Sequence, residues 1–287
     1  MRTHALANIH IAHKILILYN QVMIPQIIHY CWFGPNDIMS DRARRLAINS
    51  WRAKMPDYKI MQWSENNINI HELPDFAQHA YKNKRWAYVA DVVRFQKLYE
   101  YGGVYLDTDM LIIKDPTPLF AVGGILSSSL PLREGQGGGI GGVWSDISIW
   151  GMEDKEHISC GIIACNKNNN FIKKLYKFYT EHYKNNNMNV VIEIPKIVTK
   201  LSKEISQDEL IIYSSEYFYP LPAANKKEDY RKFITDNSYA VHLWNYSWQT
   251  PFMRIMNKLQ IVKISKAIIP KNIRPIVVNI LRRLKLN

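Results

Sequence analysis

The sequence predicts an α/β protein with an open, mostly parallel sheet flanked by helices. Strand and helix patterns alternate along the first part of the chain, at residues 24–34, 42–52, 59–63, 86–101 and 104–106. This alternation is typical of strand–helix–strand units, in which the strands run parallel and helices cover both faces of the sheet. The chain has 287 residues, 47% of them hydrophobic, which is enough for a substantial core.

The first strands and the helix between them are bounded by turn and capping residues. Residues 24–34 are mostly apolar and end in a Gly-Pro pair, which indicates a strand closed by a turn. Residues 42–52 form a predicted helix with Asp41 or Ser40 at its N-cap. The sequence MPDY then makes a turn into a second predicted strand at residues 59–63.

The central stretch of the chain combines a buried helix with a short buried strand. A polar helical connection at residues 66–84 leads into residues 86–101, which are dense in apolar residues and contain no interior Gly or Pro. Gly102 and Gly103 supply the flexible positions that end helices. Residues 104–106 then read as a strand buried within the sheet.

Acidic residues gather where this helix and strand come together. Asp107 and Asp109 follow the strand and are two residues apart, so their side chains point the same way and both carboxylates can reach one place. Asp91 and Arg94 are three residues apart and share one face of the helix. Because ligands of α/β sheets sit at the carboxyl ends of strands, the sequence predicts a site for a metal and a phosphate here. An acidic turn without function is the alternative.

The rest of the chain continues the mixed pattern. Further strands are predicted at residues 110–113, 157–165 and 210–218, and further helices at 168–184 and 194–201. The glycine-rich run Gly135 to Gly142 contains G-x-G-x-x-G, but no strand precedes it and no helix clearly follows, so a mobile loop that covers a bound donor is expected. His29, on an apolar strand, is expected to be a hydrogen-bonded core histidine and not a metal ligand.

A second group of polar and aromatic residues lies at residues 239–248 (YAVHLWNYSW). A predicted strand delivers His242, and Ser247 and Trp248 follow shortly after. An imidazole beside two carboxylates would suit Mn²⁺, which accepts mixed oxygen and nitrogen ligands. The alternative is an aromatic corner that only packs against the core.

Three spaced motifs resemble the sugar-binding region of DXD glycosyltransferases. The residues that carry the resemblance are Tyr88-x-x-Asp91-x-x-Arg94, Tyr99-x-x-Gly102-Gly103 and Tyr105-x-Asp107-x-Asp109. The chain is most similar to glycosyltransferase family 32, which includes capsule and O-antigen transferases, and is more distantly similar to clostridial glucosylating toxins. The resemblance is dense from about Ile24 to Phe120 and returns near His242.

The resemblance implies a GT-A type nucleotide-sugar-binding fold. It also implies a transferase that retains the anomeric configuration and uses a nucleoside-diphosphate sugar, with a UDP-linked donor expected first. It implies Mn²⁺ or Mg²⁺ as cofactor, which would stabilise charge on the departing diphosphate. Asp109 is expected to be the firmest metal ligand, with Asp107 shared between metal and ribose and His242 assisting.

The resemblance also assigns the donor-binding residues. Asp91 and Arg94 would hold the sugar hydroxyls, Trp32 would stack on the base, and Tyr88 belongs to the same donor-binding set. Ser247 and Trp248 would contact the diphosphate or close the site. For Trp32 a buried core position is the alternative. Relatives commonly carry an Asn near the position of Cys160, and this departure leaves the donor sugar open.

The net charge of +12 is concentrated at the C-terminus. The 51 residues after Asp236 contain nine Lys or Arg and no Asp or Glu. We therefore divide the chain into an N-terminal extension (1–23), a GT-A glycosyltransferase domain (24–250) and a basic amphipathic helical tail (251–287). Such tails lie on anionic membrane surfaces, whereas a solvated helical cap and nucleic-acid binding are the alternatives. Nucleic acid is not expected, because no nucleic-acid-binding motif accompanies the charge.

These features predict the setting and the competing functions. An odd number of cysteines without C-x-x-C favours a reducing compartment, and no apolar stretch is long enough to span a membrane. A bacterial protein at the inner face of the cell membrane is expected, acting on a surface polysaccharide or a lipid-linked saccharide. The alternatives are a glycoside hydrolase, which would need its two acids across the scissile bond, and a basic nucleic-acid- or membrane-binding protein without transferase activity.

Overall fold

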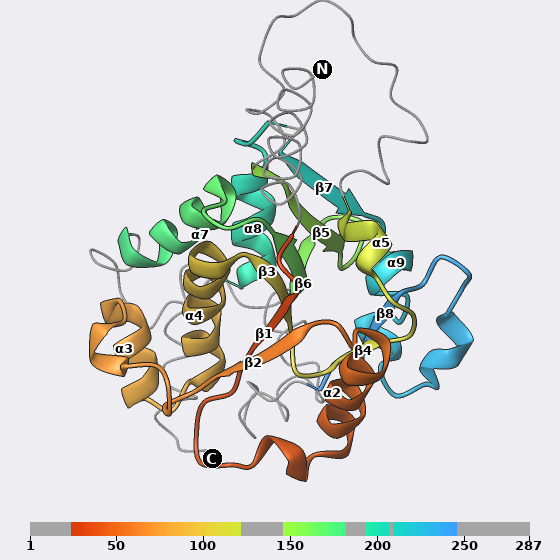
Figure 1. Ribbon diagram of the computed structural model, residues 1–287, viewed down its shortest axis with the longest axis horizontal. Helices are drawn as coiled ribbons and strands as arrows, with labels where there is room; N and C mark the ends of the chain where they lie inside the picture. Colours follow the sequence, from red (N-terminus) through yellow and green to blue (C-terminus); the bar gives the residue numbers. More distant parts are fainter. Residues whose placement is uncertain (1–23, 122–145, 182–192, 207–208, 246–287) are drawn as a thin grey trace, which may run out of the picture. The chain divides into compact units, whose positions relative to one another are not determined.

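A six-stranded mixed sheet forms the centre of the computed structural model, which describes residues 24–121, 146–181, 193–206 and 209–245 (Figure 1). The strand order is β2-β1-β3-β6-β5-β7. The strands are β1 (Ile27–Cys31), β2 (Lys59–Trp63), β3 (Gly103–Leu106), β5 (Ser148–Met152), β6 (Ile158–Cys165) and β7 (Leu210–Tyr213).

The sheet is parallel at both sides and antiparallel in the middle. Strand β1 runs parallel to β2 and β3, and β5 runs parallel to β7, whereas β6 is antiparallel to both β3 and β5. The predicted α/β class and the predominance of parallel pairing are confirmed. Strand β5 is not among the predicted strands, because its five residues include a glycine and show no alternation.

A second, two-stranded sheet pairs β4 (Met110–Ile112) with β8 (Ala240–His242). The predicted strand after Asp109 therefore exists but does not prolong β3, since a turn closed by Met110 N–H and Asp107 C=O (2.9 Å) redirects the chain. The prediction of one strand at 210–218 is wrong. Strand β7 ends at Tyr213, and Ser214 at the N-cap begins the short helix α9 (Ser215–Phe218).

The described helices are α2 (Arg42–Lys54), α3 (Asp75–Lys82), α4 (Trp86–Tyr101), α5 (Thr117–Phe120), α7 (Asn170–Glu181), α8 (Ile194–Ser202) and α9, with 3₁₀ turns at Ile38–Ser40, Ile70–Glu72, Ala223–Asn225 and Tyr230–Phe233. The longer helices agree closely with the sequence pattern, whereas the short helices α5 and α9 are not among the predicted ones. Asp41 caps α2 by accepting from the Arg44 amide at 3.0 Å, as predicted. The predicted connection at 66–84 is helical only in part, because Leu73-Pro74 separates the 3₁₀ turn from α3.

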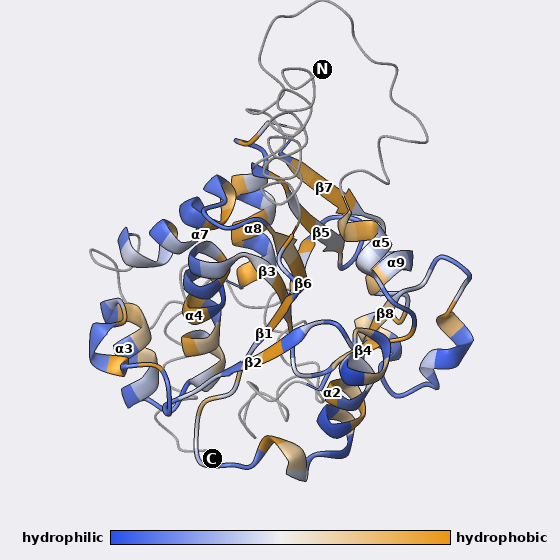
Figure 2. Cartoon of the chain, in the orientation of Figure 1, coloured by the Kyte–Doolittle hydropathy of each residue, from blue (hydrophilic) through white to orange (hydrophobic). Residues whose placement is uncertain are grey.

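The helices form layers on both sides of the sheet. Helices α4, α7 and α8 lie on one side, and α2, α9 and the β4–β8 pair lie on the other (Figure 1). The strands of the sheet are mostly apolar, although β2 carries polar residues, and the helices carry polar residues on their outer faces (Figure 2). Helix α4 ends where Gly102 adopts φ 67°, a conformation that favours glycine, and the chain then enters β3.

His29 is a core residue, as predicted. Its side chain is 0% exposed, Nε2 donates to Gly102 C=O at 2.8 Å, and Nδ1 accepts from Trp63 Nε1–H at 3.1 Å. Burial lowers the pKa of His29 to about 4, so the ring is neutral at physiological pH.

Several predicted features lie outside the described residues. They are the N-terminal extension (1–23), the glycine run Gly135 to Gly142, and the basic tail, together with Ser247 and Trp248. Among the described helices, none is long and apolar enough to cross a membrane. The three cysteines are buried and carry free thiols.

Candidate active site

The two acids of the D-x-D motif stand at the end of the central strand β3. The Asp107 amide donates to Gly161 C=O at 2.8 Å, which extends the ladder with β6 by one residue. The turn that follows places Asp109 beside β8, where its carbonyl accepts from the Leu243 amide at 3.0 Å. Backbone hydrogen bonds therefore hold Asp107 to β6 and Asp109 to β8, on either side of the turn. Asp109 is only 8% exposed.

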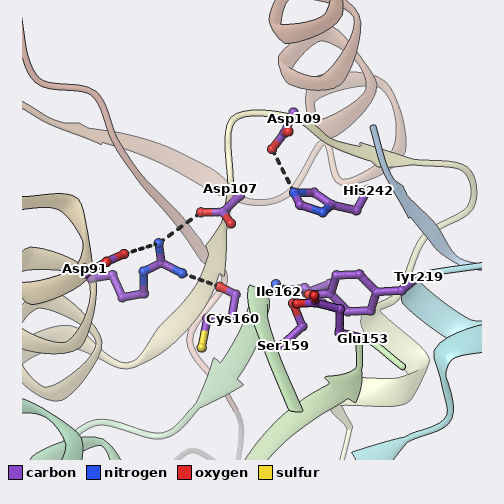
Figure 3. Close-up of polar contacts among 10 residues, drawn as sticks. Asp91, Asp107, Asp109, Glu153, Ser159, Cys160, Ile162, Tyr219 and His242 are labelled. Carbon is purple, nitrogen blue, oxygen red and sulfur yellow. Dashed lines mark hydrogen bonds and ion pairs between the residues drawn. The ribbon is translucent and has the colours of Figure 1, made fainter. Parts of the chain in front are cut away.

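Strand pairing brings His242 to the same place. Met110 pairs with His242 in the β4–β8 ladder, and His242 Nε2 lies 3.1 Å from Asp109 Oδ1 (Figure 3). One possible ligand atom from each of Asp107, Asp109 and His242 lies within 4.8 Å of the others. The three residues proposed as metal ligands are therefore gathered at one point, from chain positions more than 130 residues apart.

Charge interactions set the protonation of this histidine. Burial alone would lower the pKa of His242, but the negative charges of Asp109, Asp107 and Glu153 outweigh it and raise the pKa above its usual value. Within the described part of the chain, the buried Nδ1 of His242 has no hydrogen-bond partner.

Arg94 ties the helix α4 to the D-x-D motif. One guanidinium nitrogen donates to Asp91 and to Asp107, both at 3.1 Å, and the other donates to Cys160 C=O at 2.6 Å (Figure 3). The guanidinium also lies 4.4 Å from the centre of the Tyr105 ring. The predicted shared face of Asp91 and Arg94 thus points at Asp107, and the arginine is held by three oxygen acceptors.

The two carboxyls that Arg94 contacts have perturbed titration. Burial raises the pKa of Asp91 to about 7, and Arg94 only partly opposes this shift. Burial also raises the pKa of Asp107, against the attraction of Arg94. Asp91 therefore takes up a proton more readily than an exposed aspartate, and in its protonated form it can donate a hydrogen bond as well as accept one.

A bulge in the sheet exposes backbone groups to the site. The β5–β6 register moves from Trp150 opposite Ile163 to Gly151 opposite Ser159, which leaves residues 160–162 outside this ladder. Two of these residues bind side chains of the site: Cys160 C=O accepts from Arg94, and the Ile162 amide donates to the Tyr219 hydroxyl at 3.0 Å. Bulges commonly re-aim chain segments next to active sites.

Two glycines allow these elements to approach. A Cβ atom on Gly161 would lie 3.0 Å from the Tyr219 hydroxyl and 3.3 Å from Asp107 Oδ2. A Cβ atom on Gly151 would lie 2.8 Å from the Phe218 ring and 2.9 Å from the Tyr219 ring. Any larger residue at position 151 would push Tyr219 away from the bulge.

Sequence reasoning missed three side chains of this region, namely Tyr219, Glu153 and Ser159. Tyr219 is 1% exposed and its ring centre lies 5.9 Å from that of His242. Glu153 accepts from the Ser159 hydroxyl at 3.2 Å, and both lie next to Tyr219 (Figure 3). The only sequence signal was Gly151, because a glycine inside a strand often marks a bulge or a close approach.

Trp32 lies at the end of β1, beside a cleft of about 450 Å³. Its indole N–H donates to Asn36 C=O at 2.7 Å, and the Arg44 guanidinium lies 4.5 Å from the ring centre. The half-buried Trp32 is thus not a core residue, in contrast to the alternative considered above. The other polar and aromatic residues that line the cleft are Tyr30, Asn36, Asp37, Arg52, Gln62, Ser64, Glu65 and Asn66.

Tyr88 and Trp244 take positions that contribute to packing. Tyr88 lies one turn before Asp91 on α4 and is partly buried, with its ring 6.3 Å from that of Phe76. Trp244 donates to Leu221 C=O at 2.8 Å and its ring lies 4.2 Å from that of His242. The aromatic corner at β8 therefore exists, and its Trp244 ring packs against the His242 ring at an interplanar angle of 67°.

Two family models match separate parts of the chain. The glycosyltransferase sugar-binding region containing the DXD motif matches residues 41–123, and the alpha 1,4-glycosyltransferase conserved region matches residues 164–267. The first match covers the three motifs on which the resemblance to DXD glycosyltransferases was based, and it confirms that resemblance. No curated protein matches the chain.

Solved glycosyltransferase structures match the chain at low sequence identity. PaToxG glycosyltransferase is 18% identical, with 71% of this chain and 80% of that chain covered and a TM-score of 0.45. The galactosyltransferase LgtC, solved with donor and acceptor sugar analogues, is 13% identical, with 87% and 99% covered and a TM-score of 0.42. A glycosyltransferase involved in glycosylation of the major capsid of PBCV-1 is 14% identical, with 78% and 95% covered and a TM-score of 0.42.

Proposed function

We propose that this chain, a glycosyltransferase by its two family matches, is a metal-dependent enzyme of GT-A type that transfers a sugar from a UDP-linked donor to a saccharide hydroxyl with retention of configuration. The observation that carries the proposal is the convergence of Asp107, Asp109 and His242 at the end of β3, beside the Arg94 guanidinium.

The side chains at this point fit a divalent cation. Two carboxylates and an imidazole, with ligand atoms within 4.8 Å of one another, form the mixed oxygen and nitrogen set that Mn²⁺ accepts, and Mg²⁺ is the alternative. Asp107, Asp109 and His242 would hold the ion. When bound, it would neutralise charge that develops on the departing diphosphate.

The remaining residues would bind and orient the donor. The cleft beside Trp32 lies at the ends of β1, which is next to the D-x-D strand β3 in the sheet, and of β2, which is next to β1. This cleft would take the nucleoside, with Trp32 against the base. Asp91 and Arg94 would hold the sugar hydroxyls, because both face Asp107 from the opposite side to His242 (Figure 3). Arg94 would also face the departing phosphate, where a fixed positive charge stabilises the transition state.

The acceptor and the location are part of the same proposal. A surface polysaccharide or a lipid-linked saccharide would be the acceptor, and the nine basic residues after Asp236 would hold the enzyme at the anionic inner face of the cell membrane. Each basic residue near such a surface contributes about 1 kcal/mol of attraction.

A donor screen tests the proposal directly. Purified protein is incubated with UDP- and GDP-linked sugars, with Mn²⁺ or with a chelator, and release of the nucleoside diphosphate is measured. We expect slow, metal-dependent release of UDP from one donor. We expect the Asp109→Ala variant to lose it, and the Asp57→Ala variant, which removes an exposed acid after α2, to keep it.

The screen also separates the competing functions. If no donor is turned over and neither UDP nor GDP protects the protein against thermal unfolding in a metal-dependent way, the transferase assignment is wrong. Salt-sensitive binding to nucleic acid or to anionic vesicles that is indifferent to Asp109→Ala would then indicate a basic binding protein.

A further inference from the structure

The hairpin between β5 and β6 carries an acidic residue, Glu153, into the site. The Glu153 amide donates to His157 C=O at 2.8 Å. The Asp154 carboxylate accepts from the amides of Glu156 and His157 at 2.7 and 2.8 Å. These bonds close the hairpin on itself, so Glu153 projects from a fixed backbone.

The bulge determines where the Glu153 side chain lies. Because the register changes by three residues at Gly151, Ser159 stands opposite Gly151 and next to the carboxylate of Glu153. Ser159 is 3% exposed and interacts with the Tyr219 hydroxyl as well as with Glu153. The carboxylate therefore lies beside Tyr219, below His242, in the view of the site (Figure 3).

This carboxylate has unused hydrogen-bonding capacity. The one hydrogen bond recorded for it in the described residues comes from Ser159, whereas a carboxylate offers about four acceptor positions. The side chain is partly buried, and burial raises the pKa of Glu153 against the opposing charge of His242. A partly buried carboxylate with one protein partner has acceptor positions left for a ligand hydroxyl.

Neither the metal nor the donor sugar accounts for Glu153. Among the described residues, the group able to hold a metal comprises Asp107, Asp109 and His242, and Glu153 is not part of it. The Asp91–Arg94 pair that we assign to the donor sugar lies on the other side of Asp107 (Figure 3). Glu153 thus lies on the side of Asp107 away from Asp91, beside Tyr219 and His242 (Figure 3).

We propose that Glu153 is the residue that binds the attacking hydroxyl of the acceptor. Its carboxylate would accept a hydrogen bond from this hydroxyl and orient it toward the sugar that Asp91 and Arg94 hold. The hydroxyl oxygen would form the new glycosidic bond as the bond between the sugar and the diphosphate breaks, and the hydroxyl proton would leave with the diphosphate. Glu153 would lower the barrier by positioning alone, without accepting this proton. The inference rests on the proposed function, and it adds an acceptor-side residue on the β5–β6 hairpin.

The test uses water as the attacking hydroxyl, since the saccharide acceptor is not identified. Full-length wild type, Glu153→Gln and the matched control Glu156→Gln are compared for hydrolysis of the UDP-sugar that the wild type prefers. Glu156 is an exposed acid on the same hairpin, so its substitution removes the same charge without touching the site. The binding of UDP with Mn²⁺ is measured for each protein by calorimetry.

The expected result is a separation of kcat from donor binding. Glu153→Gln should lower kcat by about 10- to 100-fold, the range expected for loss of a hydrogen bond to a charged group, while donor KM and UDP affinity stay within about twofold. Glu156→Gln should match the wild type. Ser159→Ala, which keeps the carboxylate but removes its hydrogen bond, should lower kcat by a smaller factor, and it is the decisive variant if Glu153→Gln does not fold.

Other results would overturn the inference. Equal kcat for Glu153→Gln and Glu156→Gln would exclude Glu153 from the acceptor side. A loss of UDP affinity in Glu153→Gln would place the residue with the donor or the metal. A wild type that neither binds UDP nor hydrolyses any donor would refute the proposed function itself, a result that is distinct from both.

Discussion

Replacing Arg94 by Met should destabilise the protein in a pH-dependent way. Arg94 is 5% exposed and is the cation that both Asp91 and Asp107 contact at 3.1 Å. Methionine has a similar length but no charge, so the variant leaves two carboxyls and the Cys160 carbonyl without this partner. Removing one member of a buried ion pair costs about 3 to 5 kcal/mol, and we expect a loss of this size at alkaline pH.

The pH dependence follows from Asp91. Its pKa is about 7 in the folded protein and 3.8 as the reference value, a difference that corresponds to about 4 kcal/mol. Between pH 3.8 and about pH 7 the folded protein holds a proton on Asp91 that the unfolded chain has released. The free energy of unfolding therefore falls as the pH rises through this range. Without Arg94, which lowers this pKa, the folded value moves above 7 and the fall continues to higher pH. The deficit of the variant relative to wild type should therefore grow with pH.

Urea unfolding at about pH 6 and about pH 9 measures this deficit. Thermal unfolding at the same two pH values gives a second measure. The loss of about 3 to 5 kcal/mol corresponds to a fall in Tm of about 6 to 20 °C at the higher pH, at about 2 to 4 °C per kcal/mol for a domain of this size. The double variant Asp91→Asn with Arg94→Met removes the titrating group and should show a smaller change with pH. A deficit that is equal at both pH values would refute the reasoning, because it would mean that Asp91 does not take up the missing charge as a proton.

Three further predictions test other parts of the site and the core. Asp109→Asn should abolish the Mn²⁺-dependent stabilisation of the protein by UDP against thermal unfolding. For the wild type this stabilisation amounts to about 2.7 kcal/mol when the UDP concentration is about 100 times Kd. If the variant keeps the stabilisation, Asp109 is not a metal ligand. Gly151→Ala should destabilise by about 1 to 3 kcal/mol in urea unfolding, because its Cβ would meet the Tyr219 ring at 2.9 Å, and unchanged stability would show that the ring can move. His29, with its pKa lowered to about 4, should make wild-type stability fall between about pH 6.5 and about pH 4, since unfolding then takes up a proton, and His29→Gln should reduce that fall of about 3 kcal/mol.

The sequence predicted best where local rules decide the structure. Helix α4 has the predicted ends because apolar periodicity extends to Tyr101 and only glycine suits the left-handed φ at Gly102. The D-x-D acids follow the next strand, and the (i, i+3) relation of Asp91 and Arg94 follows from helix geometry. The Asp91–Arg94 pair of the helix meets Asp107 through the Arg94 guanidinium, because strand β3 begins immediately where helix α4 ends.

Long-range pairing could not be predicted in this way. His242 meets Asp109 because β4 pairs with β8, and nothing in the spacing of these short strands fixes that register; only the resemblance pointed to it. The position of Glu153 depends on a three-residue shift in the register of the β5–β6 pair, and the position of Tyr219 depends on the turn into α9. Such irregularities arise from packing between distant segments, which a single sequence does not display.

The charges of the site explain why it can exist before any ligand binds. Asp91, Asp107, Asp109 and Glu153 would repel one another if each were ionised alone, but basic groups lie among them. Asp91 and Asp107 contact Arg94, Asp109 contacts His242, and the charges of Asp109, Asp107 and Glu153 raise the pKa of His242. Arg94 is fixed by the Cys160 carbonyl and cannot leave, whereas His242 is held by one carboxylate oxygen and can exchange its proton. In the proposed function, a divalent cation would take the place of a proton on His242 and leave the Arg94 cluster intact. Metal binding and sugar binding would then use separate halves of one acidic site joined at Asp107.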